Sequence, residues 1–318
     1  YLRIYFLGLP FLFMYNVLSA MFNALGKSRI PLYFLIFSSV FNVVLDIIMV
    51  TKMDMGVAGV AWATLIAQGI SAVCCLIYII KRFPILHLER KNFEISWGSF
   101  GRLLKLGIPM GLQFSITAIG TIIVQSAVNI YGPVYMAGFS AAGKIQNIFA
   151  TVFTSFGATI ATYVGQNRGA GKMDRVKNGV RYTQFMIWGW SVFVMFLMFF
   201  FGKYLTYLFV DPSEQDVVKV SVTYFRTVFW AYPFLGSIFL YRNTLQGMGY
   251  GLVPMLGGVF ELVARAGIVV LIAGHTSFAG VCLADPTAWI AALIPLVPYY
   301  LHVMKKYKNR SRVQAVED

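Results

Sequence analysis

Long apolar runs alternate with short polar connections along the whole chain, and their lengths predict membrane-spanning helices. We predict nine of them, at residues 4–26, 31–50 and 55–80, two within 106–143, and four at about 183–210, 218–247, 252–273 and 278–304. At 1.5 Å per residue, each is long enough to cross a hydrocarbon core of about 30 Å. The uncharged stretch 106–143 is too long for one crossing, and Tyr131-Gly132-Pro133 supplies the turn that divides it. The fold class is therefore all-α, in a polytopic membrane protein.

Composition agrees with this prediction. Of the 318 residues 58% are hydrophobic and only 12% are charged, against about 25% charged residues in soluble domains. The net charge of +14 does not indicate nucleic acid, because the basic residues are not gathered into one stripe or arm. The cysteines lie in apolar runs and the histidines are isolated, so we expect no metal site and no cofactor.

The positions of lysine and arginine predict the orientation in the membrane. They cluster in alternate connections, at residues 27–29, 81–105, 168–181 and 305–312. Such clusters face the cytoplasm in most membrane proteins. We therefore expect a multi-pass protein of the plasma (inner) membrane. The start of the chain is expected outside, and the C-terminus in the cytoplasm.

An internal repeat predicts the architecture. A shift of 223 positions aligns Tyr1, Arg3, Phe6, Pro10, Phe11, Leu12, Gly26 and Pro31 with Tyr224, Arg226, Phe229, Pro233, Phe234, Leu235, Gly249 and Pro254. A later match, residues 58–60 with 279–281, needs a shift of 221. The simplest account is a two-lobed, pseudo-symmetric transporter of twelve helices (6+6), with nine present here and three expected before residue 1. Residues 1–80 would form the last three helices of the N-terminal lobe, 81–100 a cytoplasmic linker, and 101–318 the C-terminal six-helix lobe with a basic cytoplasmic tail.

The run 31–50 contains the first candidate for chemistry. Asp46 and Asn42 lie one helical turn apart and therefore on one face. An ionised carboxylate within a spanning helix costs about 2.5–3.5 kcal/mol on insertion scales and is usually kept for an ion, a proton or a partner. Two plainer interpretations stay open: Asp46 reaches headgroup water near the helix end, or it pairs with a basic residue elsewhere.

Several segments resemble the multidrug and toxic compound extrusion (MATE) family of secondary transporters. They are GLPFLFMYNVLSAMFNALGKSRIP at 8–31, NVVLD at 42–46, GVAGVAWAT at 56–64, VGQNRGAGK at 164–172 and LADPTAW at 283–289. The resemblance implies an antiporter, driven by protons or sodium ions, that exports amphipathic and often cationic drugs or metabolites. We would expect it to act as a monomer among membrane lipids. A phosphate-binding loop in VGQNRGAGK is not expected, because its spacing is one residue too long; we interpret it as a helix end and turn.

In the family's cation-coupled branch, an ion site in the N-terminal lobe uses an aspartate of the first helix, an Asn and an Asp of the fifth and a Thr of the sixth. The matching positions here are Asn42, Asp46 and Thr64, and the first-helix aspartate would precede residue 1. Carboxylate, amide and hydroxyl oxygens are hard ligands that suit a hard cation.

The second lobe does not repeat this residue set. Under the repeat Asn42 falls opposite Arg265, Asp46 opposite Val269 and Thr64 opposite Asp285. Glu261 and Arg265 share a helix face, and with Asp285 they form either a structural ion pair or a second site for substrate or protons.

Two polar residues are candidates for the cavity. Gln113 lies on a helix where some relatives carry a glutamate, so we do not expect a carboxylate-based sodium site there. Lys144 either positions an anionic or amphipathic ligand or extends to the outer interface.

Three other functions are compared with the sequence. A lipid-linked oligosaccharide flippase of the same superfamily would line its cavity with basic residues, for which only Lys144, Arg226, Arg242 and Arg265 are candidates. A nonfunctional truncated remnant also stays open. An enzyme is not expected, because no paired carboxylates, metal cluster or activated nucleophile lie within the spans.

Overall fold

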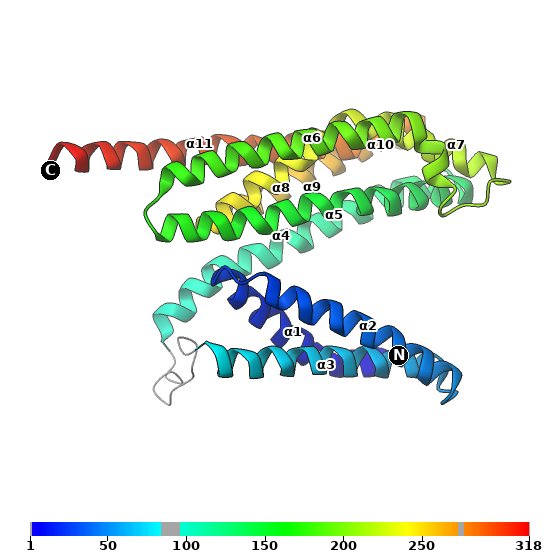
Figure 1. Ribbon diagram of the computed structural model, residues 1–318. Helices are drawn as coiled ribbons and strands as arrows, with labels where there is room; N and C mark the ends of the chain where they lie inside the picture. The colour runs from blue at the N-terminus through cyan, green and yellow to red at the C-terminus, as the bar shows by residue number, and fades with distance from the viewer. Residues whose placement is uncertain (1, 84–95, 273–276, 318) are drawn as a thin grey trace. The chain divides into compact units, whose positions relative to one another are not determined.

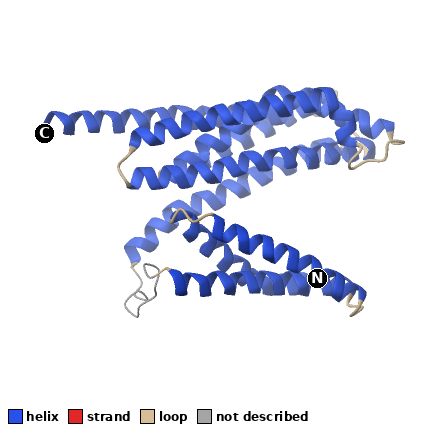
Figure 2. Ribbon diagram, viewed as in Figure 1, coloured by secondary structure: helices blue, strands red, loops and turns tan. Residues whose placement is uncertain are grey.

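The computed structural model describes residues 2–83, 96–272 and 277–317. Its described residues form helices joined by short loops, without a strand among them (Figure 2). This confirms the predicted all-α class. The chain divides into two compact units, Tyr1–Ser96 and Trp97–Asp318, which are described separately.

The first unit has three helices, α1 (Leu2–Ala24), α2 (Arg29–Thr51) and α3 (Gly56–Arg82). The middle position belongs to α3, which packs along both others, while α1 and α2 scarcely touch. Small buried residues on α3, such as Gly59 and Ala63, permit this close approach. A Cβ placed on Gly59 would lie 3.0 Å from Cβ of Met49.

The second unit contains the remaining helices, of which the long helices α5, α6 and α11 run alongside one another in Figure 1. They are α4 (Trp97–Asn129), α5 (Pro133–Gly169), α6 (Met173–Thr206), α7 (Gln215–Val228), the 3-10 turn η3 (Phe229–Ala231), α8 (Tyr232–Gly247), α9 (Leu252–Ile272), α10 (Phe278–Cys282) and α11 (Ala284–Glu317). Within this unit α9 packs against α4 and α11, and α8 packs against α5, α6 and α11. Side chains such as Phe153, Ile187 and Ile238 fill the core between them.

Eight helical segments within the described residues are long and apolar enough to cross a membrane. Two predicted runs are broken. The run 218–247 divides into α7 and α8 at η3. Pro233 favours a break there, because it lacks an N–H donor and its ring would clash with a helical carbonyl at Phe229. Pro286 has the same effect four residues after Cys282, where α10 ends and α11 begins. Neither α7 nor α8 alone reaches the length of a span.

Two helix ends support the internal repeat. Gly26 ends α1 at φ 72°, and Gly249 ends α8 at φ 79°. In each case the glycine N–H bonds to a carbonyl three residues back, and the next N–H bonds to one five residues back, as in a Schellman motif. The carbonyls belong to Asn23 and Phe22 in one unit, and to Gln246 and Leu245 in the other. The second donors are Lys27 and Tyr250. Each donor and each acceptor in the first unit is 223 positions before its equivalent in the second, so the shift that aligns the sequences also aligns these backbone hydrogen bonds.

Three predicted connections can be compared with the structure. The turn at Gly132 is confirmed, with φ 97° at the glycine and Pro133 as the first residue of α5. VGQNRGAGK forms the end of α5 and a turn at Gly171, φ 71°, as expected. Helix extends into both edges of the predicted linker 81–100, because α3 ends at Arg82 and α4 begins at Trp97; its middle, 84–95, lies outside the described residues.

Candidate functional site

Asn42 and Asp46 lie one turn apart on α2, and both are half-buried. Oδ1 of Asp46 and Nδ2 of Asn42 are shielded from solvent, yet neither has a hydrogen-bond partner among the described residues. Buried polar atoms are nearly always hydrogen-bonded in proteins, so each exception needs an explanation. No basic side chain in the described part of the chain pairs with Asp46, which removes the ion-pair interpretation within that part.

The seam between α2 and α3 brings Thr64 to the level of Asn42. Ser38 Oγ donates to the Ala67 carbonyl at 3.0 Å, and Ser71 Oγ donates to the Phe34 carbonyl at 3.2 Å. Continuing this antiparallel register by one turn places Asn42 level with residues 63–64. The contact between Gly59 and Met49 then places Asp46 between the levels of residues 63–64 and 59. The Thr64 hydroxyl donates to the Val60 carbonyl at 2.9 Å, so its oxygen lone pairs remain able to accept or ligate.

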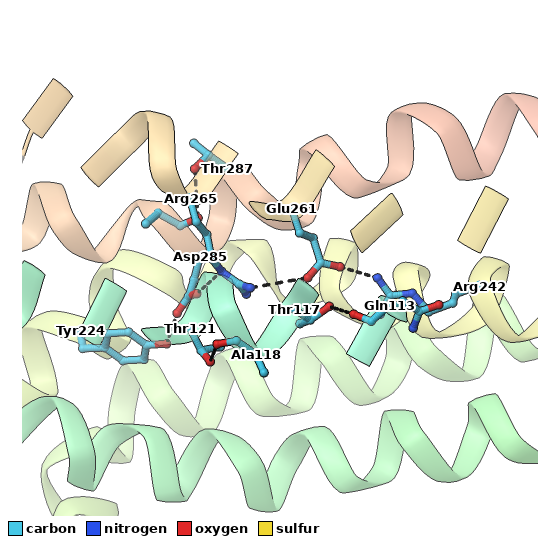
Figure 3. Close-up of polar contacts among 11 residues, drawn as sticks. Gln113, Thr117, Ala118, Thr121, Tyr224, Arg242, Glu261, Arg265, Asp285 and Thr287 are labelled. Carbon is cyan, nitrogen blue, oxygen red and sulfur yellow. Dashed lines mark hydrogen bonds and ion pairs between the residues drawn. The ribbon is translucent and has the colours of Figure 1, made fainter. Parts of the chain in front are cut away.

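The second unit gathers Glu261, Arg265 and Asp285, as the sequence suggested, and adds Arg242 and Tyr224 (Figure 3). Glu261 Oε1 lies 2.5 Å from Arg242 Nη2, and its Oε2 lies 3.6 Å from Arg265 Nη1. Asp285 Oδ1 accepts from Arg265 Nε at 3.2 Å. We call these five residues the C-unit network; it joins α7, α8, α9 and α11.

The C-unit network is buried and electrically balanced. Its members are between 2% and 9% exposed. The two guanidinium groups of Arg242 and Arg265 match the two carboxylates of Glu261 and Asp285, so no net charge is left in the interior. Buried charges of this kind are tolerated only when paired and hydrogen-bonded.

Tyr224 completes the surroundings of Asp285. Its hydroxyl lies 2.8 Å from Asp285 Oδ2 and is also within hydrogen-bonding distance of Gln146 Oε1. The single phenolic proton can serve one of these acceptors at a time. The guanidinium of Arg265 therefore contacts Oδ1 of Asp285, and the Tyr224 hydroxyl contacts Oδ2.

The two cavity candidates do not join this network. Gln113 is 2% exposed, and its Oε1 accepts from Gln246 Nε2 at 3.1 Å, which ties α4 to α8. Lys144 is exposed on α5, and its ammonium lies 5.6 Å from the centre of the Phe209 ring in the connection after α6.

The sequence did not predict that Arg242 and Tyr224 belong to the C-unit network, or that Gln146 contacts the Tyr224 hydroxyl. One feature of the sequence does point to Arg242: it is a charged residue late in an apolar run, where a buried partner is expected. Its partner Glu261 is 19 residues away on another helix. Nothing in the local pattern pairs the two.

Comparison with known families identifies the chain. The MatE family profile matches residues 109–271, which is just over half of the 318 residues. The chain belongs to the MATE family. A second profile, lipid II flippase MurJ, matches residues 1–131. Probable multidrug resistance protein YpnP of Bacillus subtilis (strain 168) is 34% identical over 253 residues, covering 78% of this MATE chain and 55% of YpnP. The chain thus spans about half the length of that relative.

Two further comparisons extend over nearly the whole chain. Probable multidrug resistance protein YoeA of the same bacterium is 25% identical over 99% of this chain and 70% of its own length. A solved structure of the outward-facing conformation of a multidrug resistance MATE family transporter of the MOP superfamily has a TM-score of 0.89 at 19% identity. That match covers 97% of this chain and 69% of the other, and it establishes that the two share a fold.

Proposed function

We propose that this MATE family protein is a secondary active antiporter in which a proton or sodium ion at Asp46 drives export of small amphipathic, often cationic molecules. The relatives named multidrug resistance proteins support the choice of substrate class. The observation that carries the ion-binding part is the shielded, unpartnered Oδ1 of Asp46, with Asn42 on the same helix face and Thr64 level with Asn42 on α3.

The charge of Asp46 requires compensation within the membrane. Keeping Asp46 ionised within a spanning helix costs about 2.5–3.5 kcal/mol on insertion scales when no counter-charge is present. A bound cation or a proton removes that cost. Since the described residues supply no basic partner for Asp46, we attribute the compensation to an exchangeable ion.

Ion occupancy would bias the conformational equilibrium of the transporter. A ligand shifts an equilibrium only by its differential affinity for the two states, so the ion must bind Asp46 more tightly in one of the outward- and inward-open states. Alternating access of two lobes is the general mode of transporters built from repeats. The clustered Lys and Arg residues support placing the C-terminus in the cytoplasm and the protein in the plasma membrane.

Replacing Asp46 with Asn tests the proposal while keeping the side chain's shape. In cells expressing the full product of the gene, Asp46→Asn should abolish active efflux of a fluorescent cationic dye, with normal amounts of protein in the membrane. Asp54→Asn is the matched control, because Asp54 is exposed in the turn after α2. Efflux by Asp46→Asn equal to that of Asp54→Asn rules out the proposed role.

A lipid-linked oligosaccharide flippase is the second candidate, and the MurJ profile match at residues 1–131 favours it. A flippase would use uncompensated basic side chains to hold pyrophosphate groups. In the second unit Arg242 and Arg265 are already engaged by Glu261 and Asp285. Translocation of a fluorescent lipid pyrophosphate in vesicles, unaffected by Asp46→Asn, would favour the flippase over the antiporter.

A further inference from the structure

The proposed ion site in the first unit has a structural counterpart in the second. The repeat aligns Asn42 with Arg265 and Thr64 with Asp285. In the first unit the register between α2 and α3 puts residues 42 and 63–64 at one level. In the second unit the aligned residues meet directly, because Arg265 Nε lies 3.2 Å from Asp285 Oδ1. The two pairs therefore occupy equivalent seams in related helix pairs.

The chemical contents of the two seams differ, because none of the three residues of the proposed ion site is repeated in the second unit. In the first unit a carboxylate oxygen of Asp46 and the amide nitrogen of Asn42 are shielded and have no partner among the described residues. In the second unit the carboxylate of Asp285 has a cation already in place, which is covalently part of α9. The equivalent of a visiting ion is thus built into the chain.

The packing around Arg265 holds the guanidinium in this position. Glu261 Oε2 lies 3.6 Å from Nη1 on the side away from Asp285. On α4, a Cβ placed on Gly120 would lie 3.3 Å from both Cδ and Nη1 of Arg265, so the absent side chain leaves space that Arg265 uses. Arg265 is 5% exposed. A side chain so enclosed has little freedom to leave Asp285.

The charge balance shows what Arg265 compensates. Arg242 already neutralises Glu261 at 2.5 Å. The guanidinium of Arg265 is therefore the counter-charge of Asp285. Removing it would leave one buried carboxylate with only the Tyr224 hydroxyl as a partner at 2.8 Å. Such a site must take up a proton or a free cation.

We propose that Arg265 is a tethered cation occupying a cation site formed by Asp285 and Glu261, the counterpart of the exchangeable site at Asp46. In the second unit the site is permanently filled, so ion exchange is confined to the first. This extends the proposed function, and rests on it for the role of Asp46. The occupancy of the Asp285 site by Arg265 rests on the distances alone. A free guanidinium ion is the ligand class that the emptied site would accept.

Chemical rescue tests the tethered cation without measuring transport. The full chain carrying Arg265→Ala is purified in detergent, and its thermal unfolding midpoint is measured with increasing, low millimolar methylguanidinium. We expect the midpoint to fall by roughly 10 °C relative to the unmodified protein and to recover saturably with methylguanidinium. The double variant Arg265→Ala/Asp285→Ala lacks the carboxylate and should show no saturable recovery. An equal response of both variants, or no recovery in either, overturns the proposal.

A second pair of variants covers the case in which Arg265→Ala does not fold. Arg265→Lys keeps a cation, whereas Arg265→Met fills a similar volume without charge. The proposal requires the Lys variant to unfold at the higher temperature, and equal midpoints overturn it. Because both experiments read stability, their failure leaves the role of Asp46 in export untouched. Conversely, active efflux by Asp46→Asn would refute the proposed function and leave the occupancy of the Asp285 site standing.

Discussion

Gly247 at the end of α8 lies so close to Ala161 of α5 that a Cβ on the glycine would fall 2.5 Å from the Ala161 carbonyl oxygen. The obstacle is backbone, which cannot rotate aside as a side chain can. The glycine therefore sets how closely α5 and α8 approach. Arg242 lies on α8 little more than one turn before Gly247, so this contact also positions one end of the C-unit network.

Gly247→Ala should destabilise the protein by about 1–3 kcal/mol, because the added methyl group forces α5 and α8 apart. The measurement is the thermal or denaturant unfolding midpoint in detergent. Gly143→Ala is the control: Gly143 lies on α5 and a Cβ there would meet nothing within 4 Å. Equal midpoints for the two variants would contradict the packing described here.

The Arg242–Glu261 pair should behave as a buried ion pair. Arg242→Gln or Glu261→Gln alone is expected to cost about 3–5 kcal/mol, because each leaves an unbalanced charge inside the bundle. The double variant should cost less than the sum of the two.

An exposed ion pair in the same unit provides the comparison for this double-mutant cycle. Asp216 and Lys219 lie 2.9 Å apart with side chains 79% and 74% exposed. Their coupling should stay below about 1 kcal/mol. Coupling of the Arg242–Glu261 pair no larger than this would show that the network contributes little to stability.

The connection after α6 should respond to acid. Hydrogen bonds from the Ser213 hydroxyl (2.6 Å) and backbone N–H (2.8 Å) lower the pKa of Asp211, which is fully exposed. The ionised form is therefore favoured when folded. The resulting contribution to stability is fully present above the ordinary aspartate pKa of about 3.9 and is lost as the pH falls through the lower, folded-state pKa.

Ser213→Ala removes the hydroxyl donor and should raise the Asp211 pKa toward its ordinary value. Carboxyl-selective NMR titration of the two proteins provides the measurement. Ser99→Ala, near the start of α4 and far along the chain, is the control. An Asp211 pKa that Ser213→Ala leaves in place would mean that these hydrogen bonds do not cause the shift.

Much of the fold was predictable because its signals are local. Gly132 followed by Pro133 marks a turn in an otherwise uncharged stretch, and a left-handed glycine precedes the helix there. The break at η3 was not predicted, since apolar residues continue through it. Pro10 is the repeat equivalent of Pro233, yet it lies within an unbroken α1. The proline at this repeat position therefore lies beside a break in one unit and inside an unbroken helix in the other, so a proline alone does not predict a break.

The candidate sites were predictable only where one helix carries the pattern. The spacing of Asn42 and Asp46, and of Glu261 and Arg265, is visible in the sequence. The addition of Arg242 from α8 and Tyr224 from α7 depends on which faces meet in the bundle. Long-range pairing of this kind has no short-range signal in a single sequence.

A cation can be tethered in the first unit by design. Asn42→Arg places a guanidinium one turn from Asp46, as Arg265 lies one turn from Glu261. We expect the variant to remain folded and to lose export, because the added cation occupies the Asp46 site permanently. Dye efflux and the unfolding midpoint are measured together.

Asn42→Gln is the matched variant, because it keeps the amide without adding charge. It should retain more export than Asn42→Arg. If Asn42→Arg exports the dye as well as Asn42→Gln does, the site at Asp46 does not need to be empty for transport.

The central claim is that Asp46 couples an ion gradient to movement of substrate. Its most direct test uses the purified full gene product in proteoliposomes, with a proton or sodium gradient imposed across the membrane and uptake of a fluorescent cation followed over time. The account predicts gradient-driven uptake by the unmodified protein and by Asp54→Asn, and none above the gradient-free level by Asp46→Asn. Gradient-driven uptake by Asp46→Asn at the unmodified rate would contradict it.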